Sequence, residues 1–469
     1  MIFDLAVIGA GSAGLSVAAA AAQFGQSVVL FEKGDMGGEC LNTGCIPSKA
    51  LLAAAKAAHA HRSSASLGVE ADEPQISFAK VMDHVDGVIA SIAPHDSQAR
   101  FEGLGVKVVR ATAHFTGRNT LEADGKLFEA RRIVIATGSR PAVPAIPGLA
   151  EVSYFTNETI FKKRMLPGHL VIIGAGPVGL EMAQAFRRLG SEVTVLDAAM
   201  PLAKDDPELV AVVLERLRSE GIVIHANVRI RSVGSSEANI EVRLDGGQKI
   251  SGTHLLVAAG RAPNIEGLNL EGAGIERDAR GIKINGSLRS ISNRSVYVAG
   301  DAAAGLQLTH VANYHAGLII RNALFRLPVK NRSDIIPWVT FTDPELAHVG
   351  LNEAEARTTH GEKVKVLRWN FRENDRATAE GTPEGLVKII TLKNGRILGA
   401  SIVGPNAGEQ IALWSLAVSR KLKISAIASL VLPYPTLGEA GKRAAISYFA
   451  ELPGKPWLRK LIGILKLFG

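Results

Sequence analysis

Short apolar runs alternate with glycine-rich turns in the first part of the chain. The run 4–8 (DLAVI) leads into the turn 9–14 (GAGSAG), then an alanine-rich stretch from Leu15, and then the run 27–31 (SVVLF), which ends at Glu32. Short apolar runs bounded by glycine predict buried strands, and the alanine-rich stretch predicts a helix. The order indicates a strand–helix–strand unit whose G-x-G-x-x-G turn is typical of dinucleotide binding.

The same pattern recurs later in the chain. The run 169–173 (HLVII) leads into the turn 174–179 (GAGPVG), and the run 192–196 (EVTVL) ends at Asp197. In both units the first glycine and the acidic residue lie 23 positions apart. One such turn is weak evidence, but two complete units with equal spacing predict two dinucleotide sites, one for a bound flavin and one for a diffusing nicotinamide.

Each residue type in these turns has a physical reason. The first glycine permits the tight turn, the second lets the backbone approach a pyrophosphate, and the third allows the helix to pack closely on the strand. The helix N-terminus offers N–H groups to phosphates, and the acidic residue accepts hydrogen bonds from ribose hydroxyls. The predicted binding residues are Gly9, Gly11, Ser12, Ala13, Gly14, Glu32 and Lys33 in the first unit, and Gly174, Gly176, Val178, Gly179 and Asp197 in the second.

The second strand–helix–strand unit favours the binding of NADH over that of NADPH. The carboxylate of Asp197 repels the 2′-phosphate of NADPH, and no arginine occurs in 198–201 to hold that phosphate.

The chain has only two cysteines, Cys40 and Cys45, in the segment 37–49 (GGECLNTGCIPSK). A secreted disulfide scaffold needs more cysteines. A zinc site needs two further ligands, and the nearest histidines lie on a predicted helix, so we expect no metal site. A redox-active disulfide fits better, because a helix predicted to begin at Pro47 would stabilise a nearby thiolate.

Composition and charge narrow the class of protein. A length of 469 residues predicts two to four domains, and 47% hydrophobic with 21% charged residues is ordinary for a globular protein. The net charge is +8, but the chain has no basic run with interleaved aromatics, so nucleic-acid binding is not predicted. The N-terminus lacks a basic region before its apolar run, and 15–22 is too short to span a bilayer, so we expect a cytoplasmic protein.

These motifs resemble the class I pyridine nucleotide–disulfide oxidoreductases, a family that includes dihydrolipoamide dehydrogenase, glutathione reductase and mercuric reductase. The segment 37–51 is most similar to dihydrolipoamide dehydrogenase. Further motifs that carry the resemblance are 136–139 (ATGS), 259–264 (AGRAPN), 298–301 (VAGD), 395–399 (GRILG) and 435–439 (PTLGE).

The resemblance implies an α/β fold with two Rossmann-like dinucleotide-binding domains and a C-terminal α+β dimerisation domain. The implied FAD domain covers 1–150 and 266–335, and the NAD(P) domain covers 151–265. The dimerisation domain covers 336–469, including a basic amphipathic tail at 455–469. A homodimer follows, because in such enzymes each active site takes C-terminal residues from the partner subunit.

The resemblance also implies a path for electrons. Hydride passes from the nicotinamide to the flavin, which reduces the disulfide. Cys45 is the sulfur nearest the flavin and forms a charge-transfer thiolate, while Cys40 is the interchange thiol. Lys49 lies near flavin N5 and pairs with Glu181, and Asp301 binds the ribityl chain. The other cofactor-binding residues implied are Gly38, Thr137, Gly138, Gly260, Arg261 and Gly300.

One catalytic motif of the family is altered. Its disulfide reductases usually carry a His-Pro-x-x-x-Glu motif whose histidine is the acid–base for thiol exchange. Here Tyr434 occupies the histidine position, while Glu439 is retained. Free tyrosine has a pKa near 10, so it is a poor base at neutral pH, although it still donates a proton or hydrogen bond. The chain therefore lacks the residue that makes dihydrolipoamide oxidation efficient in the family. Mercuric reductases also lack the histidine, but they usually carry a C-terminal cysteine pair, which is absent here.

Several alternatives stay open. The preferred hypothesis is a dihydrolipoamide dehydrogenase-like enzyme for a small dithiol or disulfide. Rivals are a mercuric or other soft-electrophile reductase, and a diaphorase that passes electrons to a quinone at a membrane. A protein that merely holds nucleotides is disfavoured by the cysteine pair. The tail predicts an amphipathic helix, which packs on its own dimer or makes peripheral contact with a membrane.

Overall fold

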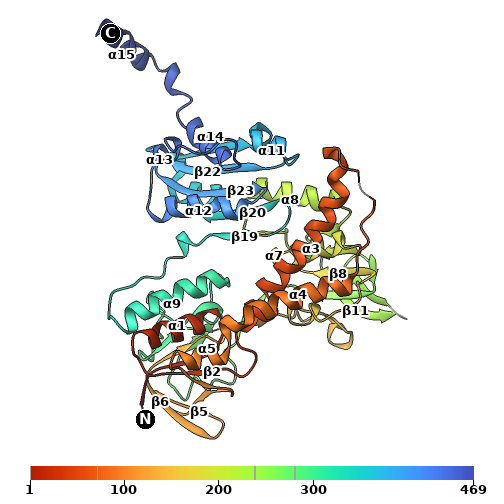
Figure 1. The fold of residues 1–469 in the computed structure, drawn as a ribbon, viewed down its shortest axis with the longest axis vertical. Coiled ribbons are helices and arrows are strands. Elements are labelled where there is room, and N and C mark those ends of the chain that lie inside the picture. Colours follow the sequence, from red (N-terminus) through yellow and green to blue (C-terminus); the bar gives the residue numbers. More distant parts are fainter. Residues whose placement is uncertain (1, 71, 237–238, 279–280, 469) are drawn as a thin grey trace. The chain divides into compact units, whose positions relative to one another are not determined.

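The computed structural model describes residues 2–70, 72–236, 239–278 and 281–468 (Figure 1). The chain forms two compact units. The first unit consists of Met1–Arg62, Ala71–Ala199 and Ile222–Ser333, and the second of Ser63–Glu70, Met200–Gly221 and Asp334–Gly469.

The first unit contains a seven-stranded sheet of order β3-β2-β1-β6-β5-β4, with β18 also paired to β6. Its members β3, β2, β1, β6 and β18 pair in parallel, whereas β4 and β5 are antiparallel. Parallel neighbours need a crossover, which α1 supplies between β1 and β2. The bounds are β1 Ile2–Ile8, α1 Ser12–Gln23, β2 Val28–Phe31, β3 Lys107–Val109, β4 His114–Phe115, β5 Thr120–Ala123, β6 Lys126–Ile135 and β18 Val296–Val298.

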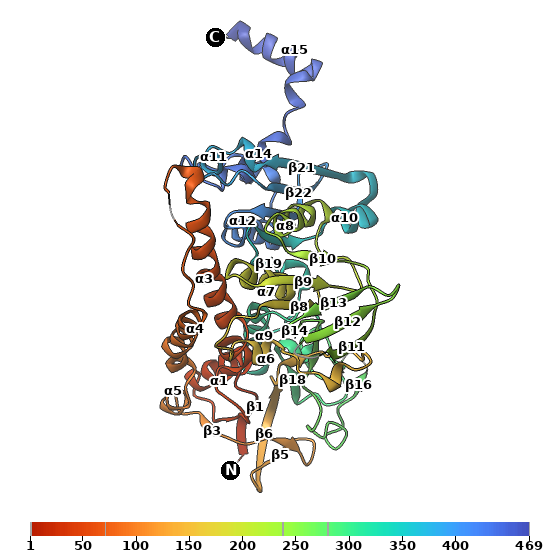
Figure 2. The same cartoon turned by 90° about the vertical axis from the view of Figure 1, so that its right-hand side faces the viewer.

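Both faces of this sheet are buried. Leu5 and Val7 of β1 pack with α1 and with α9 (Thr309–Ala323), while Ala6 and Ile8 pack on the opposite face. This alternation follows from the two-residue period of a strand. Helices α1 and α9 lie side by side although they are far apart in sequence (Figures 1 and 2). The carboxyl end of β1 is thereby held beside the start of α9.

A second parallel sheet in the first unit has the order β10-β9-β8-β14, and an antiparallel sheet has the order β11-β12-β13. Helix α7 connects β8 to β9, repeating the arrangement of β1, α1 and β2. The bounds are β8 His169–Ile173, α7 Pro177–Arg188, β9 Glu192–Leu196, β10 Val223–His225, β11 Ile230–Ser236, β12 Asn239–Leu244, β13 Lys249–Gly252 and β14 His254–Val257.

Further helices and short strands belong to the first unit. They are α2 Gly38–Asn42, α3 Cys45–Ser63, α4 Phe78–Ile92, α5 Gln98–Gly103, β7 Ser139–Pro141, α6 Asn157–Ile160, β15 Arg261–Pro263, β16 Arg277–Asp278 and β17 Gly281–Ile282. Helix α3 begins at Cys45, two residues before the predicted start at Pro47. Cys45 itself therefore occupies the first turn of the helix.

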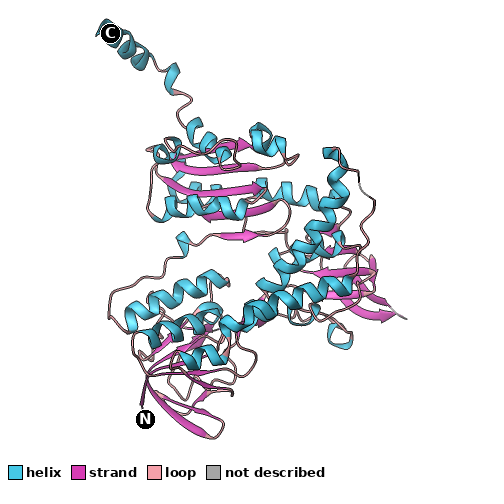
Figure 3. Ribbon diagram, in the orientation of Figure 1, coloured by secondary structure: helices cyan, strands magenta, loops and turns pink. Residues whose placement is uncertain are grey.

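The second unit is built on a five-stranded antiparallel sheet of order β19-β20-β23-β22-β21 (Figure 3). Its bounds are β19 Trp338–Thr340, β20 Glu345–Gly350, β21 Val364–Asn370, β22 Leu386–Leu392, β23 Ile397–Gly404, α8 Pro207–Ser219, α10 Glu353–His360, α11 Asp375–Ala379, α12 Ala407–Ser419, α13 Ile424–Ala428, α14 Glu439–Ser447 and α15 Pro456–Leu465. Val387 and Ile389 of β22 face the core formed with α12 and α14. Lys388, between them, points to the other face, where α8 and α10 contribute its partners.

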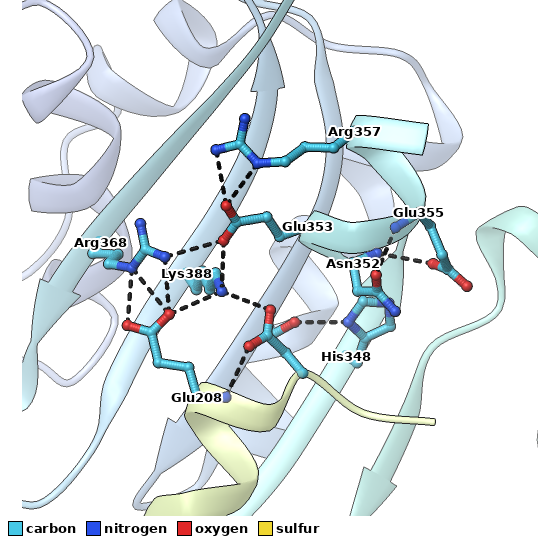
Figure 4. A network of polar contacts seen from close by, with 10 residues as sticks. Glu208, His348, Asn352, Glu353, Glu355, Arg357, Arg368 and Lys388 are labelled. Carbon is cyan, nitrogen blue, oxygen red and sulfur yellow. Dashed lines mark hydrogen bonds and ion pairs between the residues drawn. The ribbon is translucent and has the colours of Figure 1, made fainter. Parts of the chain in front are cut away.

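Lys388 is 5% exposed at its side chain and contacts three carboxylates (Figure 4). Its ammonium lies 2.7 Å from Asp206, 2.8 Å from Glu208 and 2.8 Å from Glu353. Arg368 also pairs with both Glu208 and Glu353. Because Asp206 caps α8 and Glu353 begins α10, the network fixes both helices to the sheet.

The predicted fold class is confirmed: the structure combines mixed helices and strands with parallel sheets at both glycine turns. The predicted domain boundaries stay a prediction. Among the described residues, no helix is long and apolar enough to cross a bilayer.

Candidate functional site

The first glycine turn lies between β1 and α1. Gly9 has a φ of +104°, and a Cβ there would collide with the carbonyl oxygen of Ala136. A Cβ at Gly14 would collide with the carbonyl oxygen of Gly9. Gly11, at the start of α1, instead has only the Cα of Gly38 within 4 Å of such a Cβ, at 3.8 Å. The backbone of the turn thus leaves no room for a side chain at the first and third glycines, but it leaves space beside the middle glycine.

The second glycine turn reproduces this geometry between β8 and α7. Gly174 has a φ of +116° and lies against Ala258, and a Cβ at Gly179 would collide with the carbonyl oxygen of Gly174. Nothing lies within 4 Å of a Cβ built at Gly176. Both turns therefore leave space beside a helix N-terminus, where backbone N–H groups bind phosphate oxygens.

The acidic residue after each second strand is held by backbone amides. Glu32 accepts hydrogen bonds from Ala10 N and Gly34 N, both at 2.7 Å. Asp197 accepts from Ala175 N at 2.6 Å and Ala199 N at 2.8 Å. Each carboxylate is thus fixed beside its glycine turn, as a ribose partner must be, and the two turns with their acids fit two dinucleotides.

Some of the other predicted cofactor residues lie around the first turn: a Cβ at Gly9 would meet the Cα of Thr137, and a Cβ at Gly300 would meet the Cβ of Ala13. Gly38 has a φ of +63°, and a Cβ there would lie 2.7 Å from the Cα of Gly11. Thr137 donates to the Asn264 carbonyl at 2.5 Å. Asp301 accepts from Ser139 at 2.5 Å. Ser12 and Ala13 begin α1, Lys33 follows Glu32, Gly138 precedes β7, Val178 lies in the first turn of α7, Gly260 precedes β15, and Gly300 follows β18 by two residues.

The cysteine pair lies on two successive helices. Cys40 is in α2, and Cys45 opens α3, with both present as thiols. The Cys45 sulfur lies 3.4 Å from the Thr309 hydroxyl. A hydrogen bond from the Cys40 thiol, aided by Thr309 and the positive charge of Lys49, lowers the pKa of Cys45 to about 6. The same pairing with Cys45, together with burial, raises the pKa of Cys40. Cys45 is therefore the thiolate of the pair near neutral pH.

Lys49 and Glu181 form an ion pair although they are 132 positions apart. The ammonium of Lys49 lies 2.7 Å from Glu181 Oε2, and the Glu181 side chain is only 5% exposed. Lys49 is four residues beyond Cys45 on α3, which places both on one helix face. Glu181 belongs to α7, so this pair joins the cysteine helix to the second nucleotide turn. Their role toward a flavin stays a prediction.

Sequence reasoning missed Glu39, which immediately precedes Cys40. Its carboxylate forms a double hydrogen bond with the guanidinium of Arg261 and also accepts from Asn157 at 2.6 Å. Burial raises the pKa of Glu39 against the opposing effect of Arg261. Arg261 donates in addition to Ser139 at 2.8 Å. These contacts connect α2 to the predicted cofactor residues Arg261 and Asp301, and no local motif indicated them.

Helix α9 carries two histidines after Thr309, one in its first turn and one buried further along the helix. His310 is the second residue of α9, and His315 is buried, with its Nδ1 accepting from Gly300 N at 3.2 Å. Burial lowers the pKa of His315 to about 4, so it is neutral at pH 7. His315 thus orients the segment that ends in Asp301, and it carried no sequence signal beyond lying on a helix.

Tyr434 and Glu439 belong to the second unit, whereas the cysteines belong to the first. Tyr434 is exposed and donates a hydrogen bond to Asp375 at 3.0 Å. Glu439 instead accepts from the Thr436 amide at 3.5 Å. Sequence reasoning missed Asp375, which lies 59 positions away from Tyr434. Over the ranges that the structure describes, no group of three His, Cys, Asp or Glu side chains is placed to hold a metal ion.

Comparison with known proteins agrees with this geometry. The family model described as pyridine nucleotide-disulphide oxidoreductase matches residues 3–316, and its dimerisation domain matches 336–445. A mercuric reductase from Streptomyces lividans is 35% identical over 460 residues, covering 96% of this chain and 97% of the relative. A dihydrolipoyl dehydrogenase from Thermus scotoductus is 35% identical over 458 residues, covering 94% and 96%.

Solved structures are also similar. The Cu(II) complex of the HOCl-induced flavoprotein disulfide reductase RclA from Escherichia coli matches with a TM-score of 0.86 and 25% identity, covering 95% of this chain and 99% of that one. LpdA from Mycobacterium tuberculosis matches with a TM-score of 0.87 and 26% identity, covering 94% and 99%.

Proposed function

The chain belongs to the pyridine nucleotide-disulphide oxidoreductases, and we propose that it transfers electrons from NADH through Cys45 and Cys40 to a small disulfide or a soft electrophile. It is a flavoprotein oxidoreductase that acts on a sulfur group with FAD and NAD(P). FAD, when bound, supplies a two-electron carrier between nicotinamide and sulfur. With a disulfide as acceptor, NADH and one proton yield NAD⁺ and two thiols.

The surroundings of Cys45 carry this proposal: its sulfur lies 3.4 Å from the Thr309 hydroxyl, and a hydrogen bond from Cys40 with the charge of Lys49 lowers its pKa to about 6. A thiolate is the nucleophile and the electron donor in disulfide chemistry. Cys40, whose pKa is raised, carries the proton of the pair at rest. It loses this proton as its sulfur bonds to one sulfur of the acceptor disulfide, and the other acceptor sulfur leaves and is protonated to a thiol. Lys49 holds a positive charge beside the Cys45 thiolate, and Glu181 fixes the position of that charge. The cysteine pair is thus arranged to act as a dithiol rather than as two inert residues.

Tyr434, at the position of the family's acid–base histidine, bears on which class of electron acceptor the enzyme reduces. Thiol exchange with an organic disulfide needs a proton donor to the leaving thiolate, which histidine supplies best near pH 7. In this chain Tyr434 stands at the histidine position. The hydrogen bond from Tyr434 to Asp375 raises the pKa of the phenol, so Tyr434 is a weak proton donor. A soft metal ion needs no such proton donor, because it binds both sulfurs directly and displaces the proton of Cys40. Tyr434 therefore favours a soft electrophile such as Hg(II) as a second candidate, and names of relatives include mercuric reductase.

The NADH preference rests on Asp197, whose carboxylate is fixed by two backbone amides at the second turn. A 2′-phosphate at this position would face a negative charge. A homodimer is proposed from the dimerisation domain at 336–445. A cytoplasmic location stays a prediction.

Anaerobic titration of the FAD-containing enzyme tests the proposal. NADH and then NADPH are added while the long-wavelength absorbance of a thiolate beside the flavin is followed, in the wild type and in Cys45→Ser. We expect the band after two electrons in the wild type and its loss in Cys45→Ser. Full flavin reduction without this band would exclude the cysteines from the electron path and favour a quinone reductase. Rates with lipoamide and with Hg(II) then separate the two acceptor classes.

A further inference from the structure

The C-terminal segment 455–468, here called the tail, leaves an apolar surface uncovered. It consists of α15 and the short turn 466–468, and none of its described residues is buried. Trp457 at its start is 60% exposed, and Phe468 at its end is 83% exposed. The tail lies beyond residue 445, where the match to the dimerisation domain ends. The other exposed apolar side chains are Leu461, Ile462, Ile464, Leu465 and Leu467.

The tail is also strongly basic. It carries four cations, Lys455, Arg459, Lys460 and Lys466, and no acidic residue occurs after Glu451. Glu451 itself forms an ion pair with Lys365 at 3.0 Å. At 100° per residue along the helix, Trp457, Leu461 and Ile464 share one side with Leu458, Leu465 and Phe468, and three of the four cations lie opposite. The tail therefore presents an apolar stripe bordered by positive charge.

This charge pattern decides which surface the stripe fits. A second copy of the tail would bring four cations against four, without a compensating acidic residue. An anionic bilayer meets both features, because its acyl boundary takes the apolar stripe and its headgroups take the cations. The ten residues of α15 extend about 15 Å, roughly half the thickness of a hydrocarbon core. The helix must then lie along the membrane surface.

We propose that the tail docks this enzyme onto anionic lipid bilayers as an interfacial amphipathic helix. Trp457 and Phe468 insert at the two ends of the stripe, and Arg459 and Lys460 contact the headgroups. The docking concerns only the tail, so it does not depend on the acceptor proposed above.

Vesicle sedimentation with the full-length FAD enzyme tests this docking. The vesicles are of phosphatidylcholine alone or of phosphatidylcholine mixed with phosphatidylglycerol. We expect binding only to the mixed vesicles, with loss at high salt because screening weakens the headgroup contacts. Removal of 455–469 and the double change Trp457→Ser with Leu461→Ser should abolish binding. Arg459→Glu with Lys460→Glu should weaken it at least about tenfold.

A matched control separates the tail from net charge. Lys363→Glu with Arg420→Glu changes the charge equally at exposed sites outside the tail and should retain binding. NADH-dependent flavin reduction should be unchanged in every variant, which shows that the enzyme is folded. Equal binding by the truncated and full chains would overturn the proposal. So would a truncation that changes the oligomeric state in light scattering while vesicle binding stays absent, because the stripe would then join two copies.

Discussion

The phenol of Tyr434 donates its hydrogen bond to Asp375, at 3.0 Å, rather than to Glu439. The bond and the charge of Asp375 raise the pKa of Tyr434. A phenol in this state is protonated throughout the neutral range, so it is a poor general base. The pair thus differs chemically from a histidine held by a glutamate.

A histidine at this position should restore thiol exchange. We expect Tyr434→His to increase NADH-dependent lipoamide reduction at pH 7 by at least about tenfold, because imidazole transfers protons near neutral pH. Steady-state rates measure the gain, and stopped-flow flavin reduction by NADH should not change. Tyr434→Phe is the control and should give no gain. An unchanged lipoamide rate in Tyr434→His would show that proton transfer does not limit the reaction.

Thiolate formation at Cys45 should depend on pH with a midpoint near 6. The pKa of Cys45 is lowered to about 6, so the thiolate is present above that pH and is lost as the pH falls below it. The long-wavelength absorbance of the two-electron-reduced enzyme measures this midpoint. Cys40→Ala has no disulfide to reduce, so its absorbance is followed with the flavin oxidised, and its midpoint should move upward because the main hydrogen bond is removed. Thr309→Val should raise the midpoint to a smaller extent. A midpoint at the ordinary thiol value near 9 would contradict the assignment.

The ion pair of Lys49 and Glu181 should affect the hydride step. We expect Lys49→Met to slow flavin reduction by NADH roughly a hundredfold, because a positive charge held in place by the buried Glu181 stabilises negative charge formed in the reaction. Glu181→Gln should have a smaller effect in the same direction. Stopped-flow absorbance measures both variants. Lys56→Met, at an exposed position of the same helix, is the control, and an equal loss there would indicate a general effect on α3.

Coenzyme preference should respond to Asp197. Asp197→Asn combined with Ala198→Arg should shift the ratio of kcat/KM for NADH to that for NADPH at least about tenfold toward NADPH, because repulsion is removed and a phosphate ligand is added. Steady-state kinetics with both coenzymes measure the ratio. Glu192→Gln, at the exposed start of the strand β9 that leads to Asp197, should leave this ratio unchanged.

Lys388 should be important for stability. We expect Lys388→Met to lower the free energy of unfolding by about 3 kcal/mol or more, because it leaves Asp206, Glu208 and Glu353 without their shared cation. Urea unfolding measures the loss. Lys365→Met removes the exposed pair with Glu451 and should have little effect. Similar losses in both variants would show that the network contributes no more than a surface pair.

The sequence predicted those parts of the molecule that depend on neighbouring residues. The glycine turns, their acidic partners and the cysteine segment each occupy fewer than about 30 positions, so spacing alone identified them. The family and the α/β fold class are accordingly confirmed. Helix α3 begins two residues before the predicted start at Pro47, because proline is accepted anywhere in the first turn of a helix and does not mark its first residue.

The contacts that the sequence did not indicate join residues far apart in the chain. Three such pairs come together only when strands and helices pack. They are Asp375 with Tyr434, Glu39 with Arg261, and Cys45 with Thr309. Asp375, Glu39 and Thr309 have no residue type or spacing that marks them in a single sequence. Their roles therefore depend on the tertiary fold.

Gly14 and Gly179 lack room for a Cβ because each lies against the carbonyl of its own turn, at Gly9 and Gly174. The collision is with the protein itself and not with a bound nucleotide. Selection for correct folding would therefore preserve both glycines even in a descendant that had lost its coenzyme. In this architecture the third glycine of each G-x-G-x-x-G turn is inherited with the fold. Evidence that a turn binds a nucleotide must therefore come from its open middle glycine and from the acidic residue beside it.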